Sequence, residues 1–189
     1  MGGPFEREIK LRFEGAADAR AAVVAAGAIP LHGRRLQDDR LFDTEDRSLL
    51  RERTTLRVRT DGTRSVLTFK GPVQPGPVKI REELETIVAD GDILQQVLAR
   101  LGLRVWFRYQ KYREEFTHRD VVVAVDETPI GTFVEIEGTE TAIMAMASAM
   151  GRSTADFILD SYYGLFLKCR DALGIRGPDM IFDDPDREP

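Results

Sequence analysis

Residues 5–14 read Phe-Glu-Arg-Glu-Ile-Lys-Leu-Arg-Phe-Glu, and a charged side chain occupies every even position. The odd positions are apolar except for Arg7. Successive side chains of a strand point to opposite faces, so this period of two predicts a β-strand with one wholly charged face. Such a face is either the wet side of a sheet or the polar interior of a closed one.

Further along the chain, the same reasoning predicts about eight strands and four helices. Thr60-Asp-Gly-Thr63 is a good turn sequence between two of the strands, and Gly71–Pro77 is too rich in glycine and proline for either kind of element. The other expected strands cover residues 40–42, 56–59, 66–70, 79–88, 105–116, 121–126 and 132–137, and the helices cover residues 16–26, 92–101, 139–150 and 153–173. Mostly hairpin connections predict an antiparallel sheet large enough to curl or close.

The composition is that of an ordinary globular protein. The chain has 189 residues, of which 42% are hydrophobic and 31% are charged. No apolar run approaches the ~20 residues of a membrane-spanning helix, and Cys169 as the single cysteine excludes an internal disulfide framework. We therefore expect a cytoplasmic protein with no membrane partner, either monomeric or homodimeric.

Taken by itself, the net charge of −5 argues against an anionic ligand. Residues 177–189, however, contribute −4 of it and contain three of the nine prolines. We expect this segment to be an acidic, flexible tail that follows one domain at residues 1–176. The domain itself is almost neutral, so the placement of its charges matters more than their sum. No basic excess points to nucleic acid.

If the alternation holds, one face of the sheet collects seven cations and eight anions. The cations are Lys10, Arg57, Arg59, Lys70, Arg81, Lys111 and Arg113, and the anions are Glu6, Glu8, Glu83, Glu85, Glu115, Asp126, Glu135 and Glu137. A solvated outer face is the simpler interpretation for any one strand. Ordinary wet faces mix Thr, Ser and Asn with their charges, however, and this one does not. A closed barrel would instead enclose these groups, which then need pairing, water or a ligand.

The separate groups indicate phosphate and metal chemistry. The Glu6/Glu8 and Glu135/Glu137 pairs each place two carboxylates on one strand face, and oxygen ligands without His or Cys suit Mg²⁺ or Mn²⁺. Guanidinium forks and lysine ammonium groups suit phosphate oxygens. One Glu-x-Glu pair is a weak signal, but two pairs beside several basic strands make a stronger one.

The sequence resembles the CYTH domain of the triphosphate tunnel metalloenzymes. Glu6-Arg-Glu8-Ile-Lys10 matches the Glu-x-Glu-x-Lys motif of that family. The resemblance continues in order through Leu41–Thr44, Leu56–Arg59, Leu67–Pro72, Arg81–Glu85, Arg108–Arg113, Gly131–Glu137 and Asp160–Tyr163. It implies an α+β fold in which a closed eight-stranded antiparallel β-barrel forms a tunnel and helices pack outside.

The resemblance also implies a division of roles among these residues. The metal ligands for Mg²⁺ or Mn²⁺ would be Glu6, Glu8, Glu83, Glu85, Asp126, Glu135 and Glu137. The residues that bind the substrate would be Lys10, Arg57, Arg59, Lys70, Arg81, Lys111 and Arg113. Glu6, Glu8, Lys10, Lys70 and Arg113 would be the catalytic residues.

The implied activity is phosphoryl or nucleotidyl transfer on a small triphosphate, namely ATP, thiamine triphosphate or tripolyphosphate. The motif spelling is closest to the class IV adenylate cyclases, which convert ATP to cyclic AMP and pyrophosphate. A triphosphate hydrolase is the alternative, and a non-catalytic module that binds nucleotide or polyphosphate is a further one. The carboxylates favour an enzyme, because a pure anion binder gains nothing from acidic groups beside its ligand.

Overall fold

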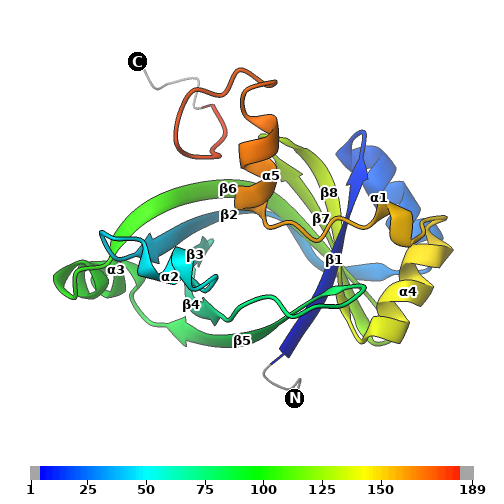
Figure 1. Cartoon of the computed structure of the whole chain (residues 1–189). Coiled ribbons are helices and arrows are strands. Elements are labelled where there is room, and N and C mark those ends of the chain that lie inside the picture. Colours follow the sequence, from blue (N-terminus) through cyan, green and yellow to red (C-terminus); the bar gives the residue numbers. More distant parts are fainter. Residues whose placement is uncertain (1–4, 184–189) are drawn as a thin grey trace.

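Eight antiparallel strands close into a barrel in the computed structural model, which describes residues 5–183 (Figure 1). The strand order around the barrel is β1-β5-β4-β3-β2-β6-β7-β8. The strands are β1 (Phe5–Phe13), β2 (Ile29–Asp43), β3 (Thr55–Asp61), β4 (Arg64–Lys70), β5 (Lys79–Val88), β6 (Arg104–His118), β7 (Val121–Thr128) and β8 (Gly131–Gly138). This architecture confirms the expected α+β fold.

β1 closes the barrel because it pairs with a different strand along each part of its length. Its first residues lie opposite β5, and its later residues lie opposite β8. Glu8 belongs to both ladders, since it lies opposite Lys79 on one side and Glu137 on the other. The β3–β4 hairpin turns at Gly62, whose φ of 60° suits glycine.

Helices cover the outside of the barrel and leave its charged face inside. They are α1 (Ala16–Ala25), α2 (Ser48–Arg51), α3 (Gly91–Arg100), α4 (Glu140–Ala149) and α5 (Tyr162–Cys169), with a 3₁₀ turn at Thr154–Asp156. Val23 of α1 and Ile143 of α4 are fully buried against the outward-facing Ile9, Val123 and Ile136 of the sheet. Burial of this apolar surface fixes which face of each strand points inward. No helix within residues 5–183 is long and apolar enough to cross a membrane.

α5 closes one end of the barrel. Its Leu165 and Phe166 pack on Phe107 and Phe133, which point inward from β6 and β8. Sequence reasoning expected one helix over residues 153–173, and this was wrong. The chain instead runs extended between the 3₁₀ turn and α5, with the backbone of Ile158 paired to that of Lys10. Ser161 then caps α5 by accepting a hydrogen bond from the Gly164 amide.

β2 is much longer than the expected strand at residues 40–42. It spans 15 residues and pairs with β6 across register shifts near Pro30, His32 and Arg35. These irregularities let the strand include Pro30 and Gly33, which look like loop residues in the sequence. The prediction was wrong because local turn signals were overridden by pairing with a distant strand.

The beginning of the acidic C-terminal segment lies against the barrel. Met180 is fully buried, and its backbone bonds to Arg108 and Gln110 of β6. β7 pairs with β6 only from Tyr112 onward, so this stretch of β6 has a free edge. Residues 177–183 are therefore docked, whereas a free tail was expected, and residues 184–189 lie outside the described part. The domain boundary at residue 176 stays a prediction.

Candidate functional site

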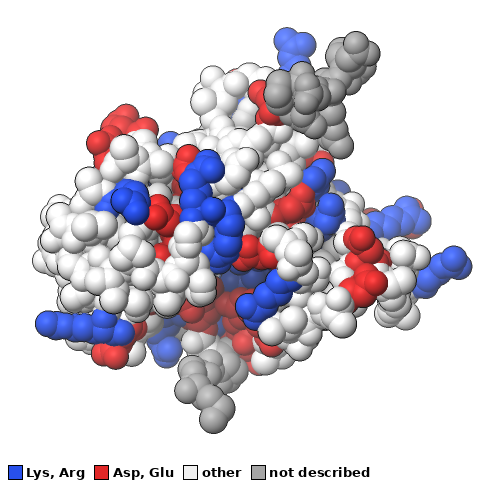
Figure 2. Space-filling view, turned by 180° about the vertical axis from the view of Figure 1, so that it is seen from behind, with Lys and Arg blue, Asp and Glu red and all other residues white. Residues whose placement is uncertain are grey.

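A cavity of about 480 Å³ occupies the barrel interior. Its walls carry fourteen of the fifteen charged residues that the strand alternation placed on one face, all but Asp126. Seen from behind in Figure 2, acidic and basic side chains gather in a hollow near the middle of the molecule. The charged face is thus the interior of a closed barrel, and the simpler interpretation of a wet outer face was wrong.

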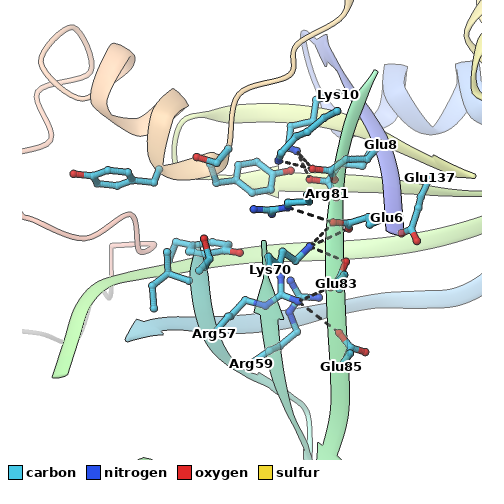
Figure 3. Close-up of a pocket in the computed structure, with 18 of the residues that line it drawn as sticks. Glu6, Glu8, Lys10, Arg57, Arg59, Lys70, Arg81, Glu83, Glu85 and Glu137 are labelled. Carbon is cyan, nitrogen blue, oxygen red and sulfur yellow. Dashed lines mark hydrogen bonds and ion pairs between the residues drawn. The ribbon is translucent and has the colours of Figure 1, made fainter. Parts of the chain in front are cut away.

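Lys70 links two acidic strands at the centre of this cavity. Its ammonium lies 2.7 Å from a Glu6 oxygen of β1 and 3.1 Å from a Glu83 oxygen of β5 (Figure 3). The Arg81 guanidinium lies 3.6 Å from Glu6 as well. The side chains of Lys70 and Glu6 are almost fully buried, so their interaction is weakly screened.

Three further residues, on β1 and β8, form a second group in the cavity wall. The ammonium of Lys10 lies 3.2 Å from both Glu8 and Glu135, and it is only 3% exposed. These two carboxylates hold the pKa of Lys10 above its usual range in spite of burial. Lys10 thus remains a cation between two anions, a position from which it could also reach a phosphate oxygen.

The basic residues of β3 are organised by a carboxylate that sequence reasoning missed. Asp39 of β2 is fully buried and accepts a 2.9 Å hydrogen bond from Arg59, with Arg57 at 3.4 Å. Burial alone raises the pKa of Asp39, but the two guanidiniums bring it below its usual range. Its inward position could be read from the alternation of β2 only once the full length of that strand is known.

Asp126 organises the basic residues of β6 in the same way. Its oxygens accept hydrogen bonds from Lys111 at 2.8 Å, from Arg113 at 2.6–2.7 Å and from the Tyr162 hydroxyl at 2.6 Å. Arg113 also contacts Glu135. Asp126 is fully buried behind the cavity wall, so its expected role as a metal ligand stays a prediction.

Tyr162 is the first residue of α5. It is buried in the core at the end of the barrel, and it also lines the cavity beneath Lys10 and Lys111, whose ammonium groups lie 5.2 and 5.0 Å from its ring centre. Lys79 was left out of the charged face although it shares the alternation of Arg81. It lies in the cavity wall 2.6 Å from Glu8.

Glu137 is a cavity carboxylate that is repelled by its neighbours. Glu137 itself is an exposed residue of β8, and within residues 5–183 its side chain forms no ion pair or hydrogen bond. Partial burial, together with repulsion from Glu6, Glu8 and Glu83, raises the pKa of Glu137 to about 7. A cluster of oxygen donors with a charge deficit has the chemistry that a hard divalent cation prefers.

The donor set fits Mg²⁺ or Mn²⁺ in chemistry but is not prearranged around one point. In the described part of the chain, no three acidic, His or Cys side chains converge as a ready ligand set. Glu6, Glu8, Glu83 and Glu135 are engaged by Lys and Arg instead, while Glu85 accepts from Thr68 at 3.1 Å. If a divalent cation and an anionic ligand enter together, the glutamates can bind the cation while their Lys and Arg partners bind the anion.

The cavity also has donors ready for an anion. The Nε atoms of Arg57 and Arg81 are buried and make no hydrogen bond in the described chain, although they lie 3.4 Å from Asp39 and 3.6 Å from Glu6. Burial disfavours the charged form of Lys111, and with the nearby Arg113 it lowers the pKa of Lys111 to about 8. An entering polyanion would supply the hydrogen bonds that these two Nε atoms lack, since a buried donor without a hydrogen bond is costly.

The remaining candidates lie away from the cavity or at its edge. His32 bonds to Glu115, His118 bonds to the Gly27 carbonyl, and neither is among the described residues that line the cavity. Arg108 points outward and pairs with Asp38. An apolar and aromatic end of the cavity, formed by Leu41, Leu50, Trp106, Tyr109 and Tyr163, was not foreseen from the sequence.

Comparison with known proteins places these features in a family. The family model described as "CYTH domain" matches residues 4–175. A Methanocaldococcus jannaschii protein named "Putative adenylate cyclase" is 29% identical over 105 residues, which are 55% of this chain and 60% of that protein. The match thus spans less than two thirds of that relative.

Solved structures share the fold. A "putative adenylate cyclase" from Vibrio parahaemolyticus has a TM-score of 0.77 and 22% identity, over 88% of this chain and 99% of its own. A Hippeastrum protein described as "putative adenylyl cyclase HpAC1" has a TM-score of 0.64 and 18% identity, over 87% and 95% of the two chains. At these identities the likeness shows the fold alone.

Proposed function

This chain belongs to the CYTH domain family, and we propose that it is a divalent-metal-dependent enzyme that acts on a triphosphate held inside the barrel. The observation that carries the proposal is the composition of one cavity. It joins seven Lys and Arg side chains of the expected substrate site with seven glutamates in about 480 Å³. Neither a wet surface nor a simple anion site needs both sets.

The basic residues would bind the phosphates. Arg57 and Arg59 on β3, Lys70 on β4 and Arg81 on β5 lie on one part of the wall, and Lys111 and Arg113 on β6 lie on another. Guanidinium forks bind phosphate oxygens in pairs, and lysines act as point charges. Cations on several strands can surround a chain of three phosphates and neutralise the charge that develops during transfer.

The carboxylates would hold Mg²⁺ or Mn²⁺ beside the phosphates. Glu6 and Glu8 of β1, Glu83 of β5 and Glu137 of β8 contribute oxygens that repel one another, and Glu135 lies next to Lys10. When bound, a divalent cation supplies charge neutralisation at the phosphoryl oxygens and activates the attacking oxygen. The chain's own part is to orient the reacting groups and to exclude bulk water from a largely buried interior.

The first candidate reaction is the conversion of ATP to cyclic AMP and pyrophosphate. The names of the Methanocaldococcus and Vibrio relatives support it. In this reaction the ribose 3′ oxygen attacks the α-phosphorus and the pyrophosphate leaves. Trp106 and Tyr163 at the apolar end, 4.7 Å apart between ring centres, offer a surface for the nucleoside.

Hydrolysis of a triphosphate is the second candidate. The Hippeastrum structure is described as revealing a dominant triphosphatase activity in a protein that carries a cyclase name. Water would then attack the terminal phosphorus in the same cavity and release orthophosphate. The substrate would be ATP, thiamine triphosphate or tripolyphosphate.

Product analysis separates the two reactions. The protein is incubated with each of these three triphosphates, with Mg²⁺, with Mn²⁺ or with EDTA, and the products are identified by ³¹P NMR. Cyclic AMP with pyrophosphate supports the cyclase, and orthophosphate supports the hydrolase. In either case Glu6→Gln and Glu135→Gln should abolish metal-dependent turnover and leave the circular dichroism spectrum unchanged. No product from any substrate would contradict the enzyme proposal.

A further inference from the structure

Lys79 is a buried lysine of the cavity wall. It belongs neither to the expected phosphate-binding residues nor to the expected metal ligands. It is the first residue of β5 and lies directly across the ladder from Glu8 of β1. Its side chain is only 4% exposed. A lysine held so far from solvent requires a compensating partner.

Lys79 contacts one particular oxygen of that partner. Its Nζ lies 2.6 Å from Glu8 Oε1, and Lys10 Nζ lies 3.2 Å from the same oxygen. In the described chain, Glu8 Oε2 accepts no hydrogen bond, although Glu8 lines the cavity. Two lysines thus fix one oxygen of the carboxylate and leave the other free.

The neighbouring lysines are shared between carboxylates, whereas Lys79 is not. Lys10 lies between Glu8 and Glu135, and Lys70 lies between Glu6 and Glu83. Within residues 5–183, Lys79 forms an ion pair with Glu8 alone. If a phosphate draws Lys10 away, Lys79 is the cation that still compensates and holds Glu8.

We propose that Lys79 is a positioning residue that holds Glu8 through Oε1 and leaves Oε2 to bind a divalent cation. The inference rests on the proposed function, because it assumes that Glu8 is a metal ligand. Groups that orient a metal ligand typically contribute about 10- to 100-fold in metal affinity. A lysine that merely stood near the metal would instead weaken binding by repulsion, so the sign of the effect is diagnostic.

Binding of Mn²⁺ to the full chain, followed by electron paramagnetic resonance, tests the proposal. Lys79→Gln and Lys79→Met should each weaken Mn²⁺ binding about 10-fold or more. Lys168→Gln is the matched control, since this exposed lysine pairs with Asp160 on the outside, and it should bind as the wild type does. In a Glu8→Gln background, either Lys79 substitution should have little further effect, because the two residues act as a pair.

Other outcomes would contradict either the positioning role of Lys79 or the proposed function on which it rests. Unchanged or tighter Mn²⁺ binding in a Lys79 variant that keeps the wild-type circular dichroism spectrum would overturn the positioning role. Loss of tripolyphosphate affinity without metal, at unchanged Mn²⁺ affinity, would overturn it too and make Lys79 a phosphate ligand. A wild-type chain that binds no Mn²⁺ would refute the metal part of the proposed function itself, and the inference with it.

Discussion

Individual charges inside the barrel compensate one another through short contacts, and this pairing sets what each substitution should do. Lys70 pairs with Glu6 and Glu83, Asp39 pairs with Arg59, and Asp126 pairs with Lys111 and Arg113. Removal of one partner from a buried pair leaves an uncompensated charge, which typically costs several kcal/mol. Stability and binding must therefore be measured separately for every variant.

Lys70→Ala should mainly weaken binding of the triphosphate. The variant loses an ammonium that is within 3.1 Å of two carboxylates and close to the expected phosphate path. We expect the dissociation constant for tripolyphosphate, measured by calorimetry, to rise about 10-fold, equivalent to one charge-assisted hydrogen bond. Lys168→Ala serves as the control, and an unaltered affinity in Lys70→Ala would argue against a tunnel role.

Glu137→Gln should stabilise the metal-free protein while it impairs turnover. Glu137 is repelled by Glu6, Glu8 and Glu83, and an amide relieves that repulsion at nearly the same volume. We expect a higher melting temperature than wild type at pH 8 in EDTA, and lower Mn²⁺-dependent turnover. Such opposite effects are typical of a site whose strain serves function. A lower melting temperature with normal turnover would contradict this account.

Asp39→Asn should destabilise the fold in a pH-dependent manner. The variant leaves Arg57 and Arg59 without their buried carboxylate, at a cost of roughly 3 kcal/mol near neutral pH. The pKa of Asp39 lies below its usual range, so its contribution is present above the unfolded-state pKa of about 4 and is lost as the pH falls through the folded-state value. In urea unfolding, the difference from wild type should shrink below about pH 4; a constant difference would refute the charge-based explanation.

At the scale of elements, pairing between distant strands set element bounds that the local sequence did not predict. The alternation of β1, the hairpin of β3 and β4, and the three strands of residues 104–138 follow the sequence pattern closely. The strand predicted at residues 40–42 was too short because Pro30 and Gly33 resemble loop residues. The inward-facing Asp39 was therefore missed. The helix expected at residues 153–173 is interrupted because Ile158 pairs with Lys10 of β1, a long-range contact that no periodicity reports.

α5 depends on its cap for its position over the barrel end. Ser161 accepts a 3.1 Å hydrogen bond from the Gly164 amide, and the next residue, Tyr162, reaches Asp126. Ser161→Ala should lower the free energy of unfolding by about 1 kcal/mol, as measured by urea unfolding. Ser161→Asn retains a capping oxygen and should stay close to wild type. Equal stability of all three proteins would show that the cap contributes nothing.

At the scale of the whole molecule, net charge says little about what the protein binds. The overall charge is −5, yet the cavity wall carries cations and anions in nearly equal numbers. The period-two alternation of the sequence predicted fourteen of those residues, because side chains still alternate between the inside and the outside in a closed barrel. The mutual pairings, the apolar end and the docking of Met180 on β6 could not be read in advance, since they depend on barrel closure and register.

The central claim is that this interior binds a triphosphate together with a divalent cation. Calorimetric titration of the wild-type chain with tripolyphosphate, in Mg²⁺ and then in EDTA, tests it most directly. The account predicts one site per chain, with affinity at least about 10-fold higher in Mg²⁺, a difference of about 1.4 kcal/mol. Absence of binding in both conditions, or equal affinity with and without Mg²⁺, would contradict it.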